Sequence, residues 1–419
     1  MNGHSEAAKA PAQACRVPYG VFTEQSCYDR EQEKIFRGDA WSFVALEAEI
    51  PNPGDYKTTF IGDTPVIVAR DQDGGVNVMQ NRCAHRGALV CRELRGNAPD
   101  LKCIYHQWVY DLRGNLAGLP FRRGIQGKGG MPADFDLKNH GLNQLRTEAV
   151  NGIVFATFSR KVEGLRDYLG PMVCGAIDRI FNRPIAILGD QRQYIHANWK
   201  LYAENVRDPY HASLLHLFHT TFGIYRSSQA GGIHTDAAKR HSMLYTLKGG
   251  GNEARDREVY AGMRAFNTDF TLQDPSLLAG RIEFTDPVSM VILTVFPNLV
   301  VQQIANTLAV RQIVPYGPDA FELVWTHFGY ADDDAEMQAM RLKQANLIGP
   351  AGVISMEDGE AVEIVQRGIT RDQNQTSYIA MGGGKAEGAD HLVTEGSIIG
   401  FWEYYHKMAG ISPDWKVGI

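Results

Sequence analysis

The sequence lacks any long apolar run. Its 419 residues contain no stretch approaching the roughly eighteen consecutive apolar residues of a transmembrane candidate. The chain begins with MNGHSEAAKAPAQAC, which is polar and alanine-rich and lacks the apolar core of a secretory signal. We interpret this stretch as a disordered leader of about fifteen residues. These absences predict a protein without a membrane segment and with a cytoplasmic location.

Cysteine and net charge are also low. The 6 cysteines are too few for a disulfide framework in a chain of this length and indicate a reducing compartment. The formal charge is −6, and the 42 Lys and Arg residues are scattered rather than clustered. We therefore expect neither a nucleic-acid-binding surface nor a surface for anionic membranes. What is present, 44% hydrophobic residues over this length, is enough to bury a large core in two domains.

The first part of the chain has the texture of a small β domain. Residues 1–40 combine the leader with a helical preamble. From residue 41 to 158, short runs of β-forming residues alternate with turn signals, among them residues 73–75 and 113–115. This part is predicted to be an antiparallel, all-β domain.

The second part, residues 159–419, mixes helical patterns with longer strands. The expected elements are helices at 165–181, 198–222 and 334–348, and strand-like runs at 286–314 and 320–330. Asp334 has the character of a helix N-cap, and Gly349 followed by Pro350 ends that helix. The sequence therefore predicts an α+β domain in which a curved antiparallel sheet packs against long helices.

Two cysteines and two histidines in the first domain form a candidate metal site. Cys83 and His85 make one pair, and Cys103 and His106 make the other. Structural zinc, the alternative, usually groups cysteine with cysteine and histidine with histidine. One Cys and one His in each pair instead favour a Rieske [2Fe–2S] cluster, in which one iron takes both thiolates and the other both imidazoles. Cys91, between the pairs, is expected to be a buried apolar residue.

The two loops, CAHRG and CIYHQW, resemble the paired Rieske loops of bacterial aromatic-ring oxygenases. A second segment, NWKLYAENVRDPYHASLLHLFH at residues 198–219, resembles the mononuclear-iron motif of the same family. The resemblance implies that His211 and His216 bind a non-haem Fe(II) in a facial triad of two histidines and one carboxylate. It also marks Asp208, Glu204 and Asn205 as candidate catalytic residues.

The spacing of these histidines conflicts with a regular helix. Residues five apart lie roughly 140° around a helix axis, so His211 and His216 would point apart. His216 and His219, three apart, would face together more closely. If the family pattern holds, a helix end or a distortion must lie between His211 and His216, and His219 is a residue beside the site or in the core.

The resemblance places the carboxylate ligand far downstream. GPAGVISMEDGEAVEIVQRG, residues 349–368, resembles the acidic ligand segment of the family, and its Asp-Gly step points to Asp358. Glu357 and Glu360 are the alternatives. Without the resemblance, these acidic residues would be expected in a solvated turn.

Taken over nearly the whole chain, the resemblance is to the large (α) subunit of Rieske non-haem iron ring-hydroxylating oxygenases, in the branch acting on anthranilate, salicylate and terephthalate. It implies an N-terminal Rieske domain, a C-terminal helix-grip catalytic domain, and α3β3 hexamers with a small β subunit. Electrons from NADH would arrive through a flavin reductase, with or without a ferredoxin. Asp208 would join His211 to His106 of an adjacent chain, so that electrons cross a subunit boundary.

Arg311 is the candidate substrate-binding residue. A benzoate needs a cation in a mostly apolar pocket, and strand alternation places Arg311 on the face of Ala309 and Ile313. Terephthalate enzymes of the family carry a second Arg that aligns with Leu392, so this sequence favours a monocarboxylate. The expected reaction is 1,2-dioxygenation of anthranilate to catechol, with loss of ammonia and CO2.

Alternatives to this reaction stay open at the level of the sequence. Salicylate hydroxylation and terephthalate dioxygenation use the same cofactors. A Rieske electron carrier fused to a binding domain would lack oxygen chemistry, and a zinc-stapled binding module would lack iron altogether.

Overall fold

The computed structural model of the chain describes residues 15–249 and 253–411. The expected leader over residues 1–14 lies outside the described residues. The helical preamble is confirmed as α1 (Gly20–Thr23), α2 (Gln25–Glu31) and a π-helical segment, η1 (Gln32–Phe36). Glu31 is buried and joins this segment to the rest of the chain, since it accepts hydrogen bonds from Trp199 Nε1 at 2.7 Å and Lys200 Nζ at 2.5 Å.

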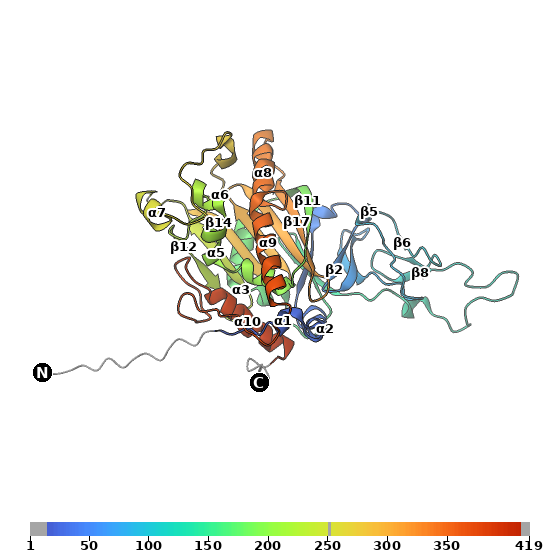
Figure 1. Cartoon of the computed structure of the whole chain (residues 1–419). Helices are drawn as coiled ribbons and strands as arrows, with labels where there is room; N and C mark the ends of the chain where they lie inside the picture. Colours follow the sequence, from blue (N-terminus) through green and yellow to red (C-terminus); the bar gives the residue numbers. More distant parts are fainter. Residues whose placement is uncertain (1–14, 250–252, 412–419) are drawn as a thin grey trace.

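The predicted β domain consists of small antiparallel sheets (Figure 1). One sheet has the order β4-β3-β2-β5 and another the order β6-β7-β8. The predicted turns at residues 73–75 and 113–115 connect β3 to β4 and β7 to β8. The strands are β2 (Asp55–Ile61), β3 (Thr64–Arg70), β4 (Val76–Gln80), β5 (Arg95–Asn97), β6 (Leu101–Lys102), β7 (Val109–Tyr110) and β8 (Leu116–Gly118), with a 3-10 turn, η3 (Leu137–Asn139), after them.

A third small sheet connects the two parts of the chain. It has the order β1-β10-β9 and comprises β1 (Ser42–Leu46), β9 (Arg146–Val150) and β10 (Ile153–Thr157), with the 3-10 turn η2 (Glu47–Glu49) after β1. Phe43 and Phe155 of this sheet share one apolar core with helix α3 (Leu165–Ile180) and with strands of the larger sheet. The predicted domain boundary between residues 158 and 159 therefore separates segments that pack together. The division into two domains at this point stays a prediction.

The second part is built on a seven-stranded antiparallel sheet with the order β11-β17-β16-β15-β14-β13-β12. Its strands are β11 (Ile185–Ile195), β12 (Gly231–Thr235), β13 (Ser242–Leu247), β14 (Val288–Val295), β15 (Leu299–Ile304), β16 (Thr307–Pro315) and β17 (Phe321–Tyr330). The run expected at 286–314 is thus three strands rather than one. This sheet, with its helices, has the predicted α+β architecture.

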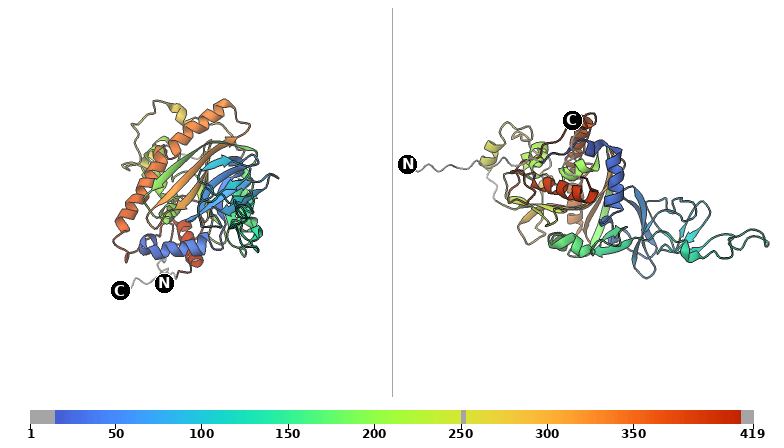
Figure 2. Two further views of the ribbon diagram at one scale, coloured as in Figure 1. Left: turned by 90° about the vertical axis from the view of Figure 1, so that its right-hand side faces the viewer. Right: turned by 90° about the horizontal axis from the view of Figure 1, so that it is seen from below.

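Helices lie on both faces of this sheet, and its side chains alternate between them. Leu308 and Val310 face the core that contains α3, whereas Ala309 and Ile313 face the core that contains α4 (Trp199–Asn205). Figures 1 and 2 show α8 and α9 crossing the sheet. The remaining helices are α5 (Pro209–Leu215), α6 (Leu217–Phe222), α7 (Glu253–Val259), η4 (Pro275–Leu278), α8 (Ala335–Ile348), α9 (Val353–Ile369) and α10 (Gly396–Ala409).

Two local expectations have clear outcomes. Asp334 caps α8 by accepting a hydrogen bond from Met337 N at 2.7 Å, as predicted. The helical segment expected at 198–222 is instead three short helices, α4 to α6. The chain breaks before Pro209, which has no N–H to continue the preceding helix, and again at His216, whose backbone is extended (φ −86°, ψ 93°).

Among the described residues, no helix is long and apolar enough to cross a membrane.

Candidate active site

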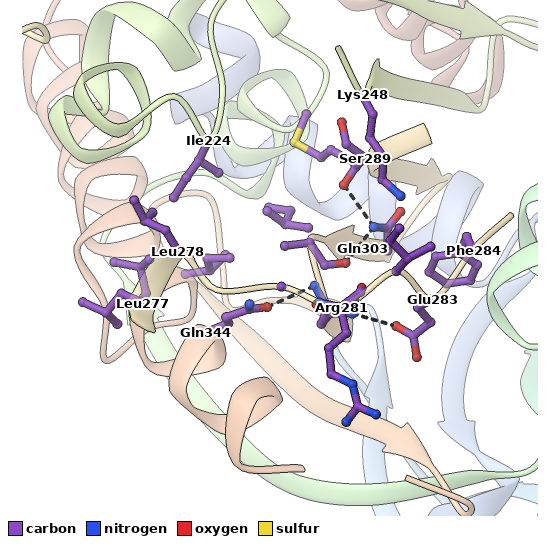
Figure 3. Close-up of a pocket in the computed structure, with 18 of the residues that line it drawn as sticks. Ile224, Lys248, Leu277, Leu278, Arg281, Glu283, Phe284, Ser289, Gln303 and Gln344 are labelled. Carbon is purple, nitrogen blue, oxygen red and sulfur yellow. Dashed lines mark hydrogen bonds between the residues drawn. The ribbon is translucent and has the colours of Figure 1, made fainter. Parts of the chain in front are cut away.

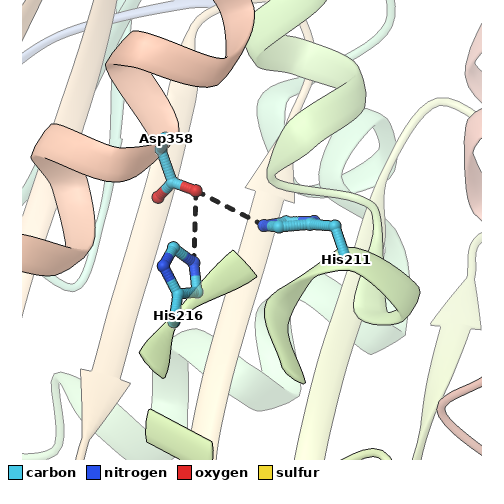
Figure 4. Close-up of side chains that lie close together, drawn as sticks. All are labelled: His211, His216 and Asp358. Atoms are coloured by element: carbon cyan, nitrogen blue, oxygen red, sulfur yellow. Dashed lines mark ion pairs between the residues drawn. The ribbon is translucent and has the colours of Figure 1, made fainter. Parts of the chain in front are cut away.

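Three predicted ligands converge between α5, α6 and α9 (Figure 4). The Nε2 atoms of His211 and His216 each lie 3.3 Å from Asp358 Oδ1. One ligand atom from each residue lies within 4.8 Å of the others, and no further group of three such side chains occurs in the described part of the chain. Two imidazoles and one carboxylate are the donors of a non-haem iron facial triad.

The break in the helix is what brings the two histidines together. Asp208 caps α5, where its Oδ1 accepts hydrogen bonds from Tyr210 N at 2.8 Å and His211 N at 3.2 Å. His211 lies in the first turn of α5, and His216 lies at the extended residue that separates α5 from α6. The ring centroids of His211 and His216 are 5.5 Å apart, so the distortion required by the family pattern is present.

A carboxylate lies beside the far nitrogen of each ring, within hydrogen-bond geometry at His216 and only as a close ionic contact at His211. His216 Nδ1 lies 2.7 Å from Glu357 Oε2, and His211 Nδ1 lies 3.3 Å from Asp208 Oδ2. Such contacts orient an imidazole so that its other nitrogen faces a metal. Glu357, an alternative ligand in the sequence, therefore contacts the outer side of His216, and Glu360 is exposed.

The acidic segment itself is helical and not a solvated turn. Asp358 lies on α9, where Ile354, Asp358 and Val362 follow one another at intervals of four and are all buried. This spacing puts Asp358 on the inner face of the helix. Asn205 of α4 lies against the same group, with its Nδ2 atom 3.1 Å from Asp358 Oδ1 and 3.3 Å from His211 Nε2.

The electrostatics of the group favour a bound cation. Burial alone would raise the pKa of Asp358 and lower the pKa of His211. For both residues, the opposite charges of their neighbours outweigh the effect of burial. The neighbouring imidazoles hold the pKa of Asp358 well below its usual range, and the two carboxylates raise the pKa of His211 to about 10. Two imidazoles and one charged carboxylate held this close together are donors that a divalent cation can bind in place of protons.

The four residues predicted to hold the iron–sulfur cluster also converge. The Cys83 and Cys103 side chains are buried, and the ring centroids of His85 and His106 lie 4.5 Å apart. Burial, together with the adjacent Cys103 thiol, raises the pKa of Cys83, and His85 Nδ1 is buried without a hydrogen-bond partner. Two thiols beside two imidazoles are the donor set that a Rieske cluster requires.

Tyr110 is a further residue at this site. Its Oη lies 3.2 Å from Cys83 Sγ and accepts a hydrogen bond from Ala84 N at 3.1 Å. The phenol hydrogen is therefore available to the sulfur. Cys91 is buried in the same small core and is not among the four, as expected for an apolar residue.

A cavity of about 70 Å³ adjoins the three-residue group. Its wall includes Arg311, which is only 6% exposed and donates from an Nη atom to Tyr202 Oη at 2.8 Å. The guanidinium also lies 4.1 Å from the centre of the Trp325 ring, on the neighbouring strand. No carboxylate is ion-paired with Arg311 in the described residues, and its Nε is buried without a partner. Tyr202 was not a predicted site residue, although it lies on α4 one turn before Asn205.

Apolar residues form most of the remaining wall of this cavity. Leu244, Met290 and Ile304 line it, and Leu392 is fully buried in the same apolar cluster. His219 also lines the cavity, and burial, with the neighbouring His216, lowers its pKa to about 3.

Figure 3 shows a larger hollow of about 350 Å³. It adjoins the cavity, since Met290 and Ile304 line both. Lys248 and Arg281 are among its polar lining residues. Together the two spaces have the size of ordinary ligand sites, roughly 300–1,000 Å³.

Of the three predicted catalytic residues, Glu204 is the one that does not line the cavity. Its Oε1 accepts a hydrogen bond from Trp402 Nε1 at 2.5 Å, on α10. Burial, partly offset by this hydrogen bond, raises the pKa of Glu204 to about 8. A catalytic role for Glu204 stays a prediction.

The sequence matches two family models in the order of its two parts. Residues 40–128 match the Rieske [2Fe-2S] domain, and residues 184–407, more than half of the chain, match the ring hydroxylating alpha subunit (catalytic domain). The chain is a ring-hydroxylating oxygenase α subunit.

This oxygenase has a Rieske cluster and a mononuclear non-haem iron as its cofactors. Supply of electrons from NADH through a reductase is typical of its family. The alternatives of structural zinc and of an electron carrier without oxygen chemistry therefore do not hold.

Three relatives of this oxygenase are named for single-ring carboxylates. The chain is 54% identical to the large subunit of anthranilate 1,2-dioxygenase from Burkholderia cepacia, covering 94% of this chain and 93% of that protein. It is 47% identical to a terephthalate 1,2-dioxygenase terminal oxygenase subunit alpha from Comamonas sp, covering 94% and 95%. It is 45% identical to the large oxygenase component of salicylate 5-hydroxylase from Ralstonia sp, covering 94% of each.

The fold is similar to that of a solved oxygenase. A crystal structure of naphthalene 1,2-dioxygenase from Rhodococcus sp. superposes with a TM-score of 0.78 at 25% identity and covers 94% of both chains. The chain therefore has the predicted fold class, a Rieske domain followed by a catalytic domain of helices and antiparallel sheet.

Proposed function

We propose that this oxygenase hydroxylates the ring of an aromatic carboxylate, with anthranilate as substrate or a similar ortho-substituted benzoate such as salicylate. The observation that carries the proposal is Arg311, a buried cation without an acidic partner in the described residues, in the wall of the cavity beside His211, His216 and Asp358. Leaving a buried charge unpaired is costly, and a ligand carboxylate would compensate it.

The metal-binding roles follow from the two groups of side chains. Cys83, Cys103, His85 and His106 are proposed to hold the Rieske cluster, and His211, His216 and Asp358 the mononuclear iron. When bound, the cluster supplies single electrons and the mononuclear iron activates O2. Arg311 holds the carboxylate, and the apolar wall orients the ring and excludes water from it.

Asp208 is proposed to connect these two sites between neighbouring chains. Its carboxylate lies beside His211 Nδ1, and its side chain is partly accessible, so a histidine of a second chain can approach it. We propose that His106 of an adjacent copy does so in a trimer-based ring, with a small β subunit completing an α3β3 hexamer. A ferredoxin or a flavin reductase would deliver the electrons. The relatives are named as large subunits or oxygenase components, which supports a need for such partners.

The apolar end of the cavity favours a monocarboxylate over terephthalate. Leu392 occupies the position at which the expected second arginine of a dicarboxylate site would stand, and it packs with Leu244 and Met290. A second carboxylate there would be buried without a cation. Terephthalate is therefore the less favoured substrate, and the adjoining hollow is the proposed route by which substrates reach the cavity.

A substrate panel tests the proposal. The purified protein, with its partner subunit and a matched reductase, is supplied with NADH, O2 and one acid at a time, and products are quantified. On anthranilate we expect catechol with one ammonia and one CO2 for each NADH consumed. Terephthalate as the best substrate would contradict the choice of substrate, and turnover only with neutral aromatics would contradict the role of Arg311.

A further inference from the structure

His219 is the most completely unsatisfied polar side chain at the cavity. The residue is 4% exposed, and neither Nδ1 nor Nε2 has a hydrogen-bond partner in the described part of the chain. Buried ring nitrogens are almost always paired, because leaving a donor or acceptor unpaired costs roughly 1–3 kcal/mol. A histidine that is buried and unpaired on both nitrogens therefore calls for a specific explanation.

The unpaired nitrogens of His219 are not explained by membership of the proposed metal-binding group. The group of three ligand atoms within 4.8 Å of one another includes His211, His216 and Asp358 but not His219. The rings of His216 and His219 meet at 5.3 Å between centroids and at 70°, an edge-to-face contact that uses neither nitrogen of His219 for a hydrogen bond. His219 instead forms part of the cavity wall.

The rest of that wall offers His219 no partner. Leu244, Met290 and Ile292 are apolar, and the hydroxyl hydrogen of Tyr225 is donated to Pro209 O at 2.7 Å, so it is not available to His219. Outside the metal group, the unpaired buried atoms of the wall thus belong to two residues, namely His219 and Arg311 through its Nε.

We infer that His219 recognises a second polar substituent, an amino or hydroxyl group, on the ring of the carboxylate that Arg311 binds. This inference rests on the proposed function and deepens it. A neutral imidazole has one acceptor nitrogen and one N–H donor, and both an aromatic amine and a phenol can donate to the acceptor. His219 is thus a specificity-determining residue, which selects substituted benzoates over benzoate itself.

The physical basis of this selection is the penalty for an unpaired group. When an acid without the substituent fills the cavity, the His219 nitrogens stay buried and unpaired, and the neighbouring Leu244, Met290 and Ile292 side chains supply no group to replace the lost hydrogen bond. A site built to hydrogen-bond a substrate group rejects analogues that lack that group more strongly than an apolar pocket rejects a change of size.

The test measures binding of three acids to the assembled, iron-loaded protein by calorimetry without O2. Anthranilate, salicylate and benzoate are compared in the natural protein, His219→Phe and His219→Gln, and iron is counted in each. The natural protein should prefer the two substituted acids by about tenfold, the value of one neutral hydrogen bond. In His219→Phe, anthranilate and salicylate should bind about tenfold more weakly while benzoate changes less than twofold. His219→Gln, which keeps a hydrogen-bonding side chain, should recover part of the preference.

Several outcomes would overturn the inference. Equal weakening of all three acids in His219→Phe would indicate a packing role, and loss of mononuclear iron would indicate a ligand. If all three acids bind the natural protein and the preference is unchanged in both variants, only the role of His219 is wrong. If none of the acids binds the natural protein, the proposed function itself fails, and the inference fails with it.

Discussion

Arg311 is the residue at which the proposed substrate choice is tested most directly. Charge-assisted hydrogen bonds to a carboxylate are worth about 1.5–3 kcal/mol, so Arg311→Leu should raise KM for anthranilate by about 10- to 150-fold. Arg311→Lys keeps the charge but not the two-pronged geometry and should recover part of the loss. Steady-state kinetics with iron counts check this. An unchanged KM in Arg311→Leu, with full iron, would exclude Arg311 from carboxylate binding.

Tyr110 is expected to affect the redox properties of the proposed cluster site. Its hydroxyl is placed to donate to Cys83 Sγ, and a hydrogen bond to a ligand sulfur stabilises the reduced cluster. Tyr110→Phe should therefore lower the reduction potential, by about 40 mV if the bond contributes about 1 kcal/mol. Potentiometric titration followed by EPR measures this. Tyr105→Phe is a matched control, because Tyr105 lies on the exposed side of His106. A raised or unchanged potential in Tyr110→Phe would contradict the donor assignment.

At the scale of elements, the start of α5 combines a helix cap with a metal-site contact in one residue. Asp208 caps two backbone N–H groups and lies beside His211 Nδ1, and these functions can be separated. Asn also caps helices well, so Asp208→Asn should retain stability and both metal sites. Because it removes the charge beside His211, coupled turnover should fall by about tenfold or more.

Asp208→Ala provides the comparison. It removes both the cap and the charge, and it should additionally lower the free energy of unfolding by about 1 kcal/mol. Thermal unfolding, iron counts and NADH-coupled product formation distinguish the two variants. Full coupled turnover in Asp208→Asn would show that the carboxylate does not connect the two metal sites.

At the scale of the whole molecule, the proposed electron path between chains makes a complementation prediction. A Cys103→Ser chain should lack the cluster and an Asp358→Ala chain should lack the mononuclear iron, so each alone should be inactive. Co-expressed in equal amounts, they should restore activity to about a quarter of the natural level, because one ordered pair of neighbours in four combines the two intact sites in a random ring. Iron counts and the Rieske EPR signal serve as controls. No activity in verified mixed oligomers would place the electron path within one chain.

Much of the local structure could be predicted because the causes are local. Asp334 caps α8 through a side chain three residues from its partner, and the turns at residues 73–75 and 113–115 join strands adjacent in sequence. Strand alternation directed Arg311 to the face of Ala309 and Ile313, and it is buried there. The helix in the acidic segment, residues 349–368, was harder to predict, because an isolated run of carboxylates suggests a solvated turn. Its helix forms where a buried stripe through Ile354, Asp358 and Val362 packs inward.

The sequence by itself determined the chemistry available to this protein. Paired Cys and His residues at short spacing, and Asp208, His211 and His216 in one segment, specify donor types that depend only on residue identity. Tertiary structure alone decided which donors meet. Asp358, rather than Glu357, lies between the Nε2 atoms of both histidines because adjacent residues of a helix point roughly 100° apart and packing sets the phase of α9. Likewise, the isolation of His219 and the packing of Leu392 in one apolar cluster with Leu244 and Met290 arise from contacts between segments distant in sequence, which no local pattern encodes.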